Sequence, residues 1–161
     1  MLLIRAAEAA DRDAIWAILE PVFRAGDTYT QPRDITRDAA LAYWHHEGHE
    51  VFVAEASGRV LGTYYLRANQ AGGGDHVANC GYMTAPAAQG RGVARAMLEH
   101  SLVQARARGF RAMQFNFVVS SNERAVKTWQ AYSFEIVGRL PGAFRHPALG
   151  DVDAFVMYRT L

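Results

Sequence analysis

Cysteine is scarce in this chain, since Cys80 is the only one among its 161 residues. A single thiol cannot form an internal disulfide, and it argues against a zinc site built on cysteines. This scarcity suits a reducing compartment, so we expect a cytoplasmic protein. Long apolar runs are also missing, and none approaches the roughly 20 residues of a membrane span. The apolar start, Leu2 to Ile4, ends at Arg5 and is too short for the core of a signal peptide.

An excess of charge of one sign is likewise absent. Lys and Arg number 17 against 16 Asp and Glu, which leaves a formal net charge of +1. Proteins that bind nucleic acids or membrane surfaces usually carry a strong basic excess, so we expect neither as a partner. The length and a 50% apolar content predict a single domain, residues 1–161, with a sizeable core.

The apolar periodicities predict the element order βααβββαβαββ, and therefore a mixed α+β sheet with helices on both faces. Ser57-Gly58 lies between two alternating runs and predicts a β-hairpin. We expect Pro21 to kink or end the first helix, Gly48 to end the second, and a loop with two prolines to separate the last two strands. The expected strands span 2–6, 50–56, 59–69, 77–85, 111–119, 135–140 and 151–160, and the expected helices begin near 11, 35, 90 and 120.

The segment QGRGVA, residues 89–94, follows a strand and opens a helix. A helix start offers unpaired N–H groups and a partial positive charge, and glycines let a phosphate oxygen come close. A P-loop is excluded because Val-Ala follows the last glycine, where Lys-Ser/Thr would be needed. The dinucleotide fingerprint fits poorly, because Arg95 stands where its third glycine belongs. The remaining interpretations are the pyrophosphate of coenzyme A and a tight turn without a ligand.

These residues resemble the GNAT superfamily of acetyl-CoA-dependent N-acetyltransferases. Its signature, Gln/Arg-x-x-Gly-x-Gly/Ala at a helix start, is matched by Gln89, Gly92 and Ala94. A second family motif, which begins Asn-x-x-Ala, is matched by Asn122 and Ala125. The resemblance covers nearly the whole chain. It implies a GNAT-like acyl-CoA N-acyltransferase fold, with a mostly antiparallel sheet of six or seven strands splayed in the middle, and acetyl-CoA as the acyl donor.

The resemblance also implies where acetyl-CoA would lie. The backbone of Tyr82, Met83 and Thr84 would pair with the pantetheine arm as an added strand does. Asn122 would form a hydrogen bond with the pantetheine or the phosphate side. The pyrophosphate would be held by Gln89, Gly90, Arg91, Gly92, Val93 and Ala94, while Arg91, Arg124 and Lys127 are either partners of the 3′-phosphate and adenine or solvated surface charges.

The catalytic residues depart from the usual GNAT pattern. Trp129 stands where the family commonly has a Tyr that protonates the leaving thiolate, and an indole N–H cannot act as an acid near neutral pH. Tyr132, one turn further on, is either a replacement or a packed core residue. Asn79 and Asn116, which are unusual in strands, either orient the thioester carbonyl and the amine or satisfy local backbone groups. In a similar GNAT branch, which includes fungal acetyltransferases of proline-analogue amino acids, such asparagines are thought to replace an acid–base pair.

The histidines and the thiol are weaker candidates. His76 precedes the same strand as Asn79 and is a candidate base. His45, His46 and His49 lack the spacing and partners of a metal site, so we expect no metal. A nucleophilic Cys80 is disfavoured, because the resemblance implies direct transfer of the acyl group.

The resemblance further implies that the acceptor would enter beside the loop GDTYTQPRD, residues 26–34. Tyr29 offers an aromatic wall, while Arg67, or Arg145 with His146, offers a cation for a carboxylate. We therefore predict transfer of an acetyl group to a small-molecule amine, such as an amino acid or an analogue. The alternatives are a CoA-binding sensor without turnover and a protein-modifying acetyltransferase. A homodimer is left open.

Overall fold

The structure is a computed structural model that describes all 161 residues. Its helices and strands follow one another in the predicted order. The strands are β1 (Leu3–Ala6), β2 (Glu50–Ala56), β3 (Arg59–Ala68), β4 (Val77–Thr84), β5 (Ala112–Val119), β6 (Glu135–His146) and β7 (Gly150–Thr160). The helices are α1 (Arg12–Ala25), α2 (Arg37–Trp44), α3 (Val93–Ala107) and α4 (Glu123–Ala131), with short 3-10 segments η1 (Ala9–Asp11), η2 (Gly72–Gly74) and η3 (Pro86–Ala88).

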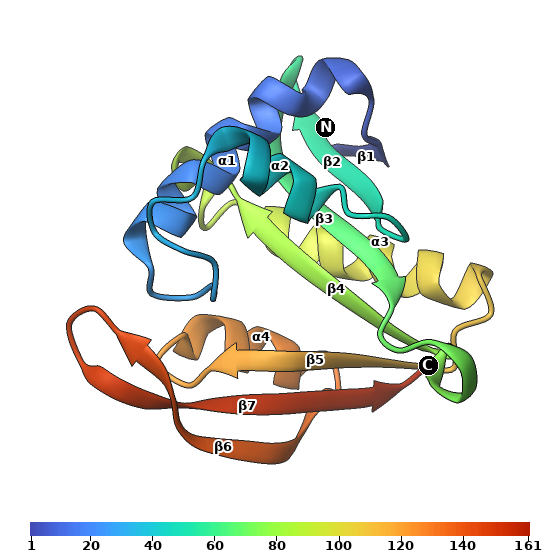
Figure 1. Cartoon of the computed structure of the whole chain (residues 1–161). Helices are drawn as coiled ribbons and strands as arrows, with labels where there is room; N and C mark the ends of the chain where they lie inside the picture. Colours follow the sequence, from blue (N-terminus) through green and yellow to red (C-terminus); the bar gives the residue numbers. More distant parts are fainter.

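All strands belong to one seven-stranded sheet, in the order β1-β2-β3-β4-β5-β7-β6. Every neighbouring pair is antiparallel except β4 and β5, which are parallel. Figure 1 shows that these two strands lie side by side near the C-terminus and diverge from there. The structure therefore confirms the expected mixed, mostly antiparallel sheet with a splayed centre.

Helices cover both faces of the sheet, as the alternation of apolar residues predicted. Tyr64 and Tyr65 follow one another in β3 and therefore point to opposite faces. Tyr64 is buried in the core beneath α3 and α4, whereas Tyr65 is buried in the core beneath α1 and α2. No helix of the chain is long and apolar enough to cross a membrane.

The β2–β3 hairpin turns at the predicted position. Ser57 and Gly58 have φ angles of 51° and 73°, so both adopt the left-handed conformation that a two-residue hairpin turn requires. Ala56 and Arg59 close the ladder on either side of the turn. The turn chemistry thus sets the register of the two strands.

The structure differs in three places from the expected ends of the elements. Helix α1 continues through Pro21 to Ala25, because Leu19 and Phe23 are buried on either side of the proline and packing offsets the lost hydrogen bond. Helix α2 ends at Trp44 rather than at Gly48, and the His45 imidazole lies 3.1 Å from the carbonyl of Leu41. That carbonyl belongs to the last turn of the helix.

The last two strands are also longer than expected. The sequence predicts a loop over residues 141–150, but β6 runs on to His146 and β7 begins at Gly150. Pro141 is accommodated because β6 is an edge strand and its register shifts between Leu140 and Phe144. The resulting hairpin brings Arg145 towards the loop that follows α1, since both line one small hollow.

A buried hydrogen bond anchors α2 to the sheet. The indole Nε1 of Trp44 donates to Thr63 Oγ1 at 3.1 Å, and that hydroxyl donates to the carbonyl of Phe52 at 2.8 Å. Trp44 and Thr63 are fully buried, so water cannot replace either partner.

We expect Thr63→Val to destabilise the protein by about 1–3 kcal/mol, because the nearly isosteric valine leaves the buried indole N–H without an acceptor. Urea unfolding of the full chain measures this change. Thr160→Val, at the exposed end of β7, is the control and should alter stability by less than about 0.5 kcal/mol. Equal effects of the two substitutions would contradict the anchoring role.

Candidate functional site

The centre of the sheet opens because β4 and β5 pair over a very short length. Their register contains only Val77 with Ala112 and Ala78 with Met113. At the next residue of β4, a side chain rather than the backbone bonds to β5. Asn79 Nδ2 donates to the carbonyl of Gln114 at 2.9 Å. From this point the two strands separate.

The unpaired edge of β4 faces the split. Asn69 donates its N–H to the carbonyl of Val77 at 2.8 Å, so the odd-numbered residues of β4 bond to β3. By alternation, Cys80, Tyr82 and Thr84 direct their backbone N–H and C=O groups towards β5, which has already turned away. These are the backbone groups that an extended ligand could pair with.

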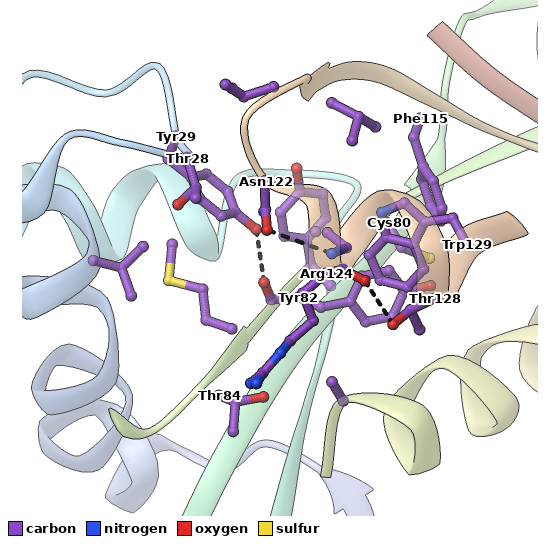
Figure 2. A pocket seen from close by; sticks show the side chains of 18 of the residues that line it. Thr28, Tyr29, Cys80, Tyr82, Thr84, Phe115, Asn122, Arg124, Thr128 and Trp129 are labelled. Atoms are coloured by element: carbon purple, nitrogen blue, oxygen red, sulfur yellow. Dashed lines mark hydrogen bonds between the residues drawn. The ribbon is translucent and has the colours of Figure 1, made fainter. Parts of the chain in front are cut away.

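A cavity of about 1040 Å³ occupies this split. The loop after α1, the strands β3, β4 and β5, and the starts of α3 and α4 all contribute to its lining. In Figure 2, Tyr29 and Thr28 lie on one side of the opening, and Phe115 and Trp129 on the other. Of the predicted site residues, the lining includes Tyr29, Arg67, Asn79, Tyr82, Met83, Thr84, Gln89, Gly90, Gly92, Val93, Ala94, Asn116 and Asn122.

One part of the cavity, which we call the donor half, is formed by the starts of α3 and α4. Gly90 and Gly92 have φ angles of 76° and 80°, a conformation that other residues rarely adopt. Gly92 is the N-cap of α3 and has no side chain to cap the first turn, so the N–H groups of that turn remain available. A Cβ at either glycine would meet no atom within 4 Å, which leaves the approach open for a phosphate.

Two arginines line the donor half, and one of them, Arg124, is among the cationic residues that the sequence singled out. Arg95 in α3 and Arg124 in α4 line the cavity, whereas Arg91 and Lys127 lie outside its lining. Arg95 is the third residue of α3 and Arg91 lies in the turn before the helix, and both side chains are exposed to solvent. Arg124 thus remains a candidate partner of the ligand's phosphates, whereas the exposed positions of Arg91 and Lys127 outside the lining favour the alternative of solvated surface charges.

Asn122 begins α4 and lines the donor half. Its Oδ1 accepts the N–H of Ala125 at 3.4 Å, so the oxygen caps the helix. Its Nδ2 has no partner in the protein and remains available as a donor. Nearby, Trp129 packs between Tyr82 and Phe115, with ring centroids 5.2 Å and 4.9 Å away, so the indole forms part of the cavity wall.

Tyr132 is not part of the cavity. The chain leaves α4 at this residue, and the phenol turns towards α3, where its hydroxyl donates to Glu99 Oε1 at 2.5 Å. This hydrogen bond to a carboxylate raises the pKa of Tyr132. This placement corrects the expectation that Tyr132 replaces the missing acid. The ring is half-buried, so Tyr132 is not a fully packed core residue either.

The remaining part of the cavity, which we call the acceptor half, has a floor of linked side chains from β3, β4 and β5. Arg67 Nε donates to Asn79 Oδ1 at 2.9 Å, and Asn79 donates across the split to β5. On β5, Gln114 Nε2 donates to Asn116 Oδ1 at 2.9 Å, and Asn116 Nδ2 donates to Asn69 Oδ1 at 2.7 Å. Gln114 was missed in the sequence, although it shares a strand face with Asn116 by alternation.

The wall of the acceptor half comes from the loop after α1. Tyr29 donates its hydroxyl to the carbonyl of Tyr82 at 2.9 Å, as the dashed line in Figure 2 shows. Its ring lies 5.9 Å from Phe23 and 6.3 Å from Trp44, centroid to centroid. The predicted substrate residue thus also satisfies one of the free carbonyls of β4.

The charges around the cavity are all positive. Its lining contains Arg67, Arg95 and Arg124, but no aspartate, glutamate or histidine. The candidate base His76 lies at the closed end of the β4–β5 pair, where its carbonyl accepts the N–H of Arg111, so that expectation is corrected. Anionic groups are therefore the ligands that this cavity favours.

The other predicted polar groups lie elsewhere. No group of three or more His, Cys, Asp or Glu side chains is arranged to hold a metal ion. Arg145 lines a smaller hollow of about 400 Å³ that shares Tyr29 and Thr30 with the main cavity. His146 instead accepts the N–H of Leu149 at 3.2 Å within the β6–β7 turn.

The unpaired edge of β4 and the glycine-opened start of α3 together suit an extended ligand that carries phosphate. The sequence pattern of the Acetyltransferase (GNAT) family matches residues 12–134, which is most of the chain. The chain therefore belongs to this family and is an acetyltransferase. The expected family and its acyl donor, acetyl-CoA, are confirmed.

Known proteins resemble the chain over different lengths. N-acetyltransferase aca1 of Schizosaccharomyces pombe is 29% identical over 98 residues, which are 60% of this chain and 47% of aca1. The chain thus spans about half the length of that curated relative. A GCN5-related N-acetyltransferase from Kribbella flavida superimposes with a TM-score of 0.94 at 41% identity, over 99% of this chain and 98% of its own.

A more distant solved structure shares the fold. The acetyltransferase yncA of Salmonella typhimurium, solved with its cofactor acetyl-CoA, has a TM-score of 0.86 at 23% identity. The match covers 100% of this chain and 94% of yncA. At this identity the likeness shows a common architecture, and it confirms the GNAT fold predicted from the sequence.

We expect Gly92→Glu to abolish the thermal stabilisation that acetyl-CoA confers, because the carboxylate would stand where the pyrophosphate approaches. Differential scanning fluorimetry with acetyl-CoA, CoA and NADH measures this loss. Gly58→Glu is the matched control, since Gly58 also has a positive φ angle and open surroundings but lies in the β2–β3 turn. Both variants should lose about 1–2 kcal/mol of stability to backbone strain. A full acetyl-CoA response in Gly92→Glu would contradict the cradle.

Proposed function

We propose that the protein transfers the acetyl group of acetyl-CoA to the amine of a small molecule that also carries a carboxylate. The observation that carries this proposal is the position of Arg67 in the acceptor half. Its Nε is bound to Asn79, but the two terminal nitrogens of the guanidinium have no partner in the protein. A guanidinium fork with free ends is suited to a carboxylate.

The donor half accounts for the other substrate. The backbone groups of β4 that remain without a partner, among them the N–H of Tyr82, would pair with the pantetheine arm, and the amides at the start of α3 would bind the pyrophosphate. Asn122 would add a donor through its free Nδ2, and Arg95 and Arg124 would neutralise the remaining phosphate charge. Each of these groups lies in one continuous lining.

The two asparagines would position the reacting atoms. Asn79 and Asn116 each use one N–H and one oxygen lone pair within the floor, so each keeps a further donor and acceptor. A free N–H near the thioester would stabilise the charge that develops on its carbonyl oxygen. A leaving thiolate needs no strong acid, because a free thiol has a pKa of only about 8.5.

The enclosure of the acceptor half favours a small acceptor over a protein. The bond between Tyr29 and the carbonyl of Tyr82 draws the loop after α1 over the split. The lining of this half contains no carboxylate that would attract a lysine side chain or a polyamine. A panel of amino acids, amino-acid amides, polyamines, aminoglycosides and peptides, assayed by thiol release, tests this preference. Turnover of peptides alone would favour a protein-modifying enzyme, and binding of acetyl-CoA without any turnover would favour a sensor.

We expect Arg67→Gln to lower kcat/KM for a carboxylated acceptor by about 10- to 100-fold, the value of a charge-assisted hydrogen bond. The corresponding amino-acid amide is the control acceptor and should lose little, because it presents no anion. Arg67→Lys should fall between the parent and Arg67→Gln, since lysine keeps the charge without the fork. Equal losses for the acid and its amide would contradict a carboxylate site.

The placement of Tyr132 generates a further test. We expect Tyr132→Phe to keep kcat within about twofold, because its hydroxyl faces Glu99 outside the cavity. Asn116→Ala, which removes an amide from the floor, should lower kcat about tenfold or more. Steady-state thiol release measures both variants, with circular dichroism to establish that each is folded. A large loss of kcat in Tyr132→Phe would instead support Tyr132 as the group that protonates the leaving thiolate.

A further inference from the structure

The cavity offers no counter-ion to an ammonium group. Its charged lining consists of Arg67, Arg95 and Arg124, with no carboxylate and no imidazole. A protonated acceptor would lose its hydration without gaining an ion pair, and Arg67 would repel it. A positive neighbour lowers the pKa of an amine, so the cavity stabilises the neutral form relative to the ammonium.

The remaining titratable groups that face the cavity are proton donors. They are Tyr29 in the loop after α1, Tyr43 in α2, Tyr65 in β3, and Cys80 and Tyr82 in β4. Burial raises the pKa of Tyr29, Tyr65 and Tyr82, and it raises the pKa of the Cys80 thiol to about 12. Phenols and thiols in this state cannot accept the proton of an amine at neutral pH.

The imidazole and carboxylate next to the cavity are held outside it. His49 stacks on the outer side of Tyr65, with ring centroids 4.2 Å apart, and its Nδ1 lies 3.0 Å from the carbonyl of Trp44. Glu99 of α3 is bound to the hydroxyl of Tyr132. His49 is the one group that could still act through Tyr65, so it is the residue that a test has to vary.

We infer that the acceptor enters as the neutral amine, and that its chemical class is a weakly basic amine with a carboxylate. This inference rests on the proposed function. The nitrogen lone pair attacks the thioester carbonyl carbon, so that a C–N bond forms and the C–S bond breaks. The sulfur leaves with the bonding electrons, and the surplus N–H proton passes through water to that thiolate. The products are the N-acetylated acceptor and the free thiol of CoA.

A pair of ligands with almost the same shape tests the charge preference without turnover. Betaine carries a quaternary ammonium and a carboxylate, and 3,3-dimethylbutanoate has carbon in place of the charged nitrogen. In calorimetry on the full chain saturated with CoA, we expect 3,3-dimethylbutanoate to bind on the order of tenfold or more tightly than betaine. Arg67→Gln should abolish the binding of 3,3-dimethylbutanoate.

The two other possible binding results would each overturn the inference. Betaine binding as tightly as 3,3-dimethylbutanoate would overturn the inference and would show that tyrosine rings such as Tyr43 and Tyr65 hold a cation. The proposed carboxylated acceptor would survive that result. Binding of neither ligand would remove the carboxylate site, and both the proposed acceptor class and the inference would fall.

The pH dependence of kcat/KM provides a kinetic test. The acceptors are 2-aminobutyrate and 4,4,4-trifluoro-2-aminobutyrate, whose fluorines lower the amine pKa at similar size. Activity should rise with pH as each amine loses its proton, and the two midpoints should differ by the difference between the two amine pKa values. His49→Asn should leave both midpoints in place.

A midpoint common to both acceptors, or one that moves in His49→Asn, would reveal a base in the protein and overturn the inference. Because thiol release would still occur, that result would leave the proposed function intact. If neither acceptor is acetylated, the proposed function loses this pair of acceptors, and the calorimetric pair decides the inference.

Discussion

The early end of the β4–β5 ladder is the constraint from which the rest of the site follows. Two pairs of residues join these parallel strands, and the amide of Asn79 makes the last link before they part. A continued ladder would satisfy the backbone of β4 internally and leave no space between the strands. Because it stops, β4 keeps backbone groups that need partners, and the cavity forms where those groups point. Tyr29 satisfies one of them from a distant part of the chain.

The two halves of the cavity are built from different chemistry. The donor half relies on backbone amides at the start of α3, which glycines leave accessible. The acceptor half relies on side chains, because Arg67, Asn79 and Asn116 belong to a hydrogen-bonded floor that joins three strands across the split. Each of these three side chains is held by at least one hydrogen bond within the floor and keeps further donors free for a substrate. The donor half thus recognises charge and extended shape, while the acceptor half positions individual atoms.

Local features of the sequence predicted local structure well. Ser57-Gly58 specified the hairpin, and Gly92 marked the start of α3, because both depend on backbone conformations that few residues adopt. The expected path of the last strands was wrong for a related reason. Pro141 indicates a loop by its local preference, but an edge strand with a shift in register accepts a proline, and nothing local shows which strand will be at the edge.

Residue types and their spacing predicted the order of the elements and the open turn before α3, because periodicity and turn chemistry act over a few residues, and the resemblance of the motifs to a known family supplied the fold. Which side chains face the cavity depended on contacts across the whole sheet. Arg95 lines it while Arg91 does not, and Tyr132 turns to Glu99, since helix rotation and packing set these directions. The absence of any carboxylate or imidazole from the cavity lining is the feature that local sequence patterns could predict least. It arises from the joint placement of separate segments of chain between α1 and α4, and no single segment encodes it.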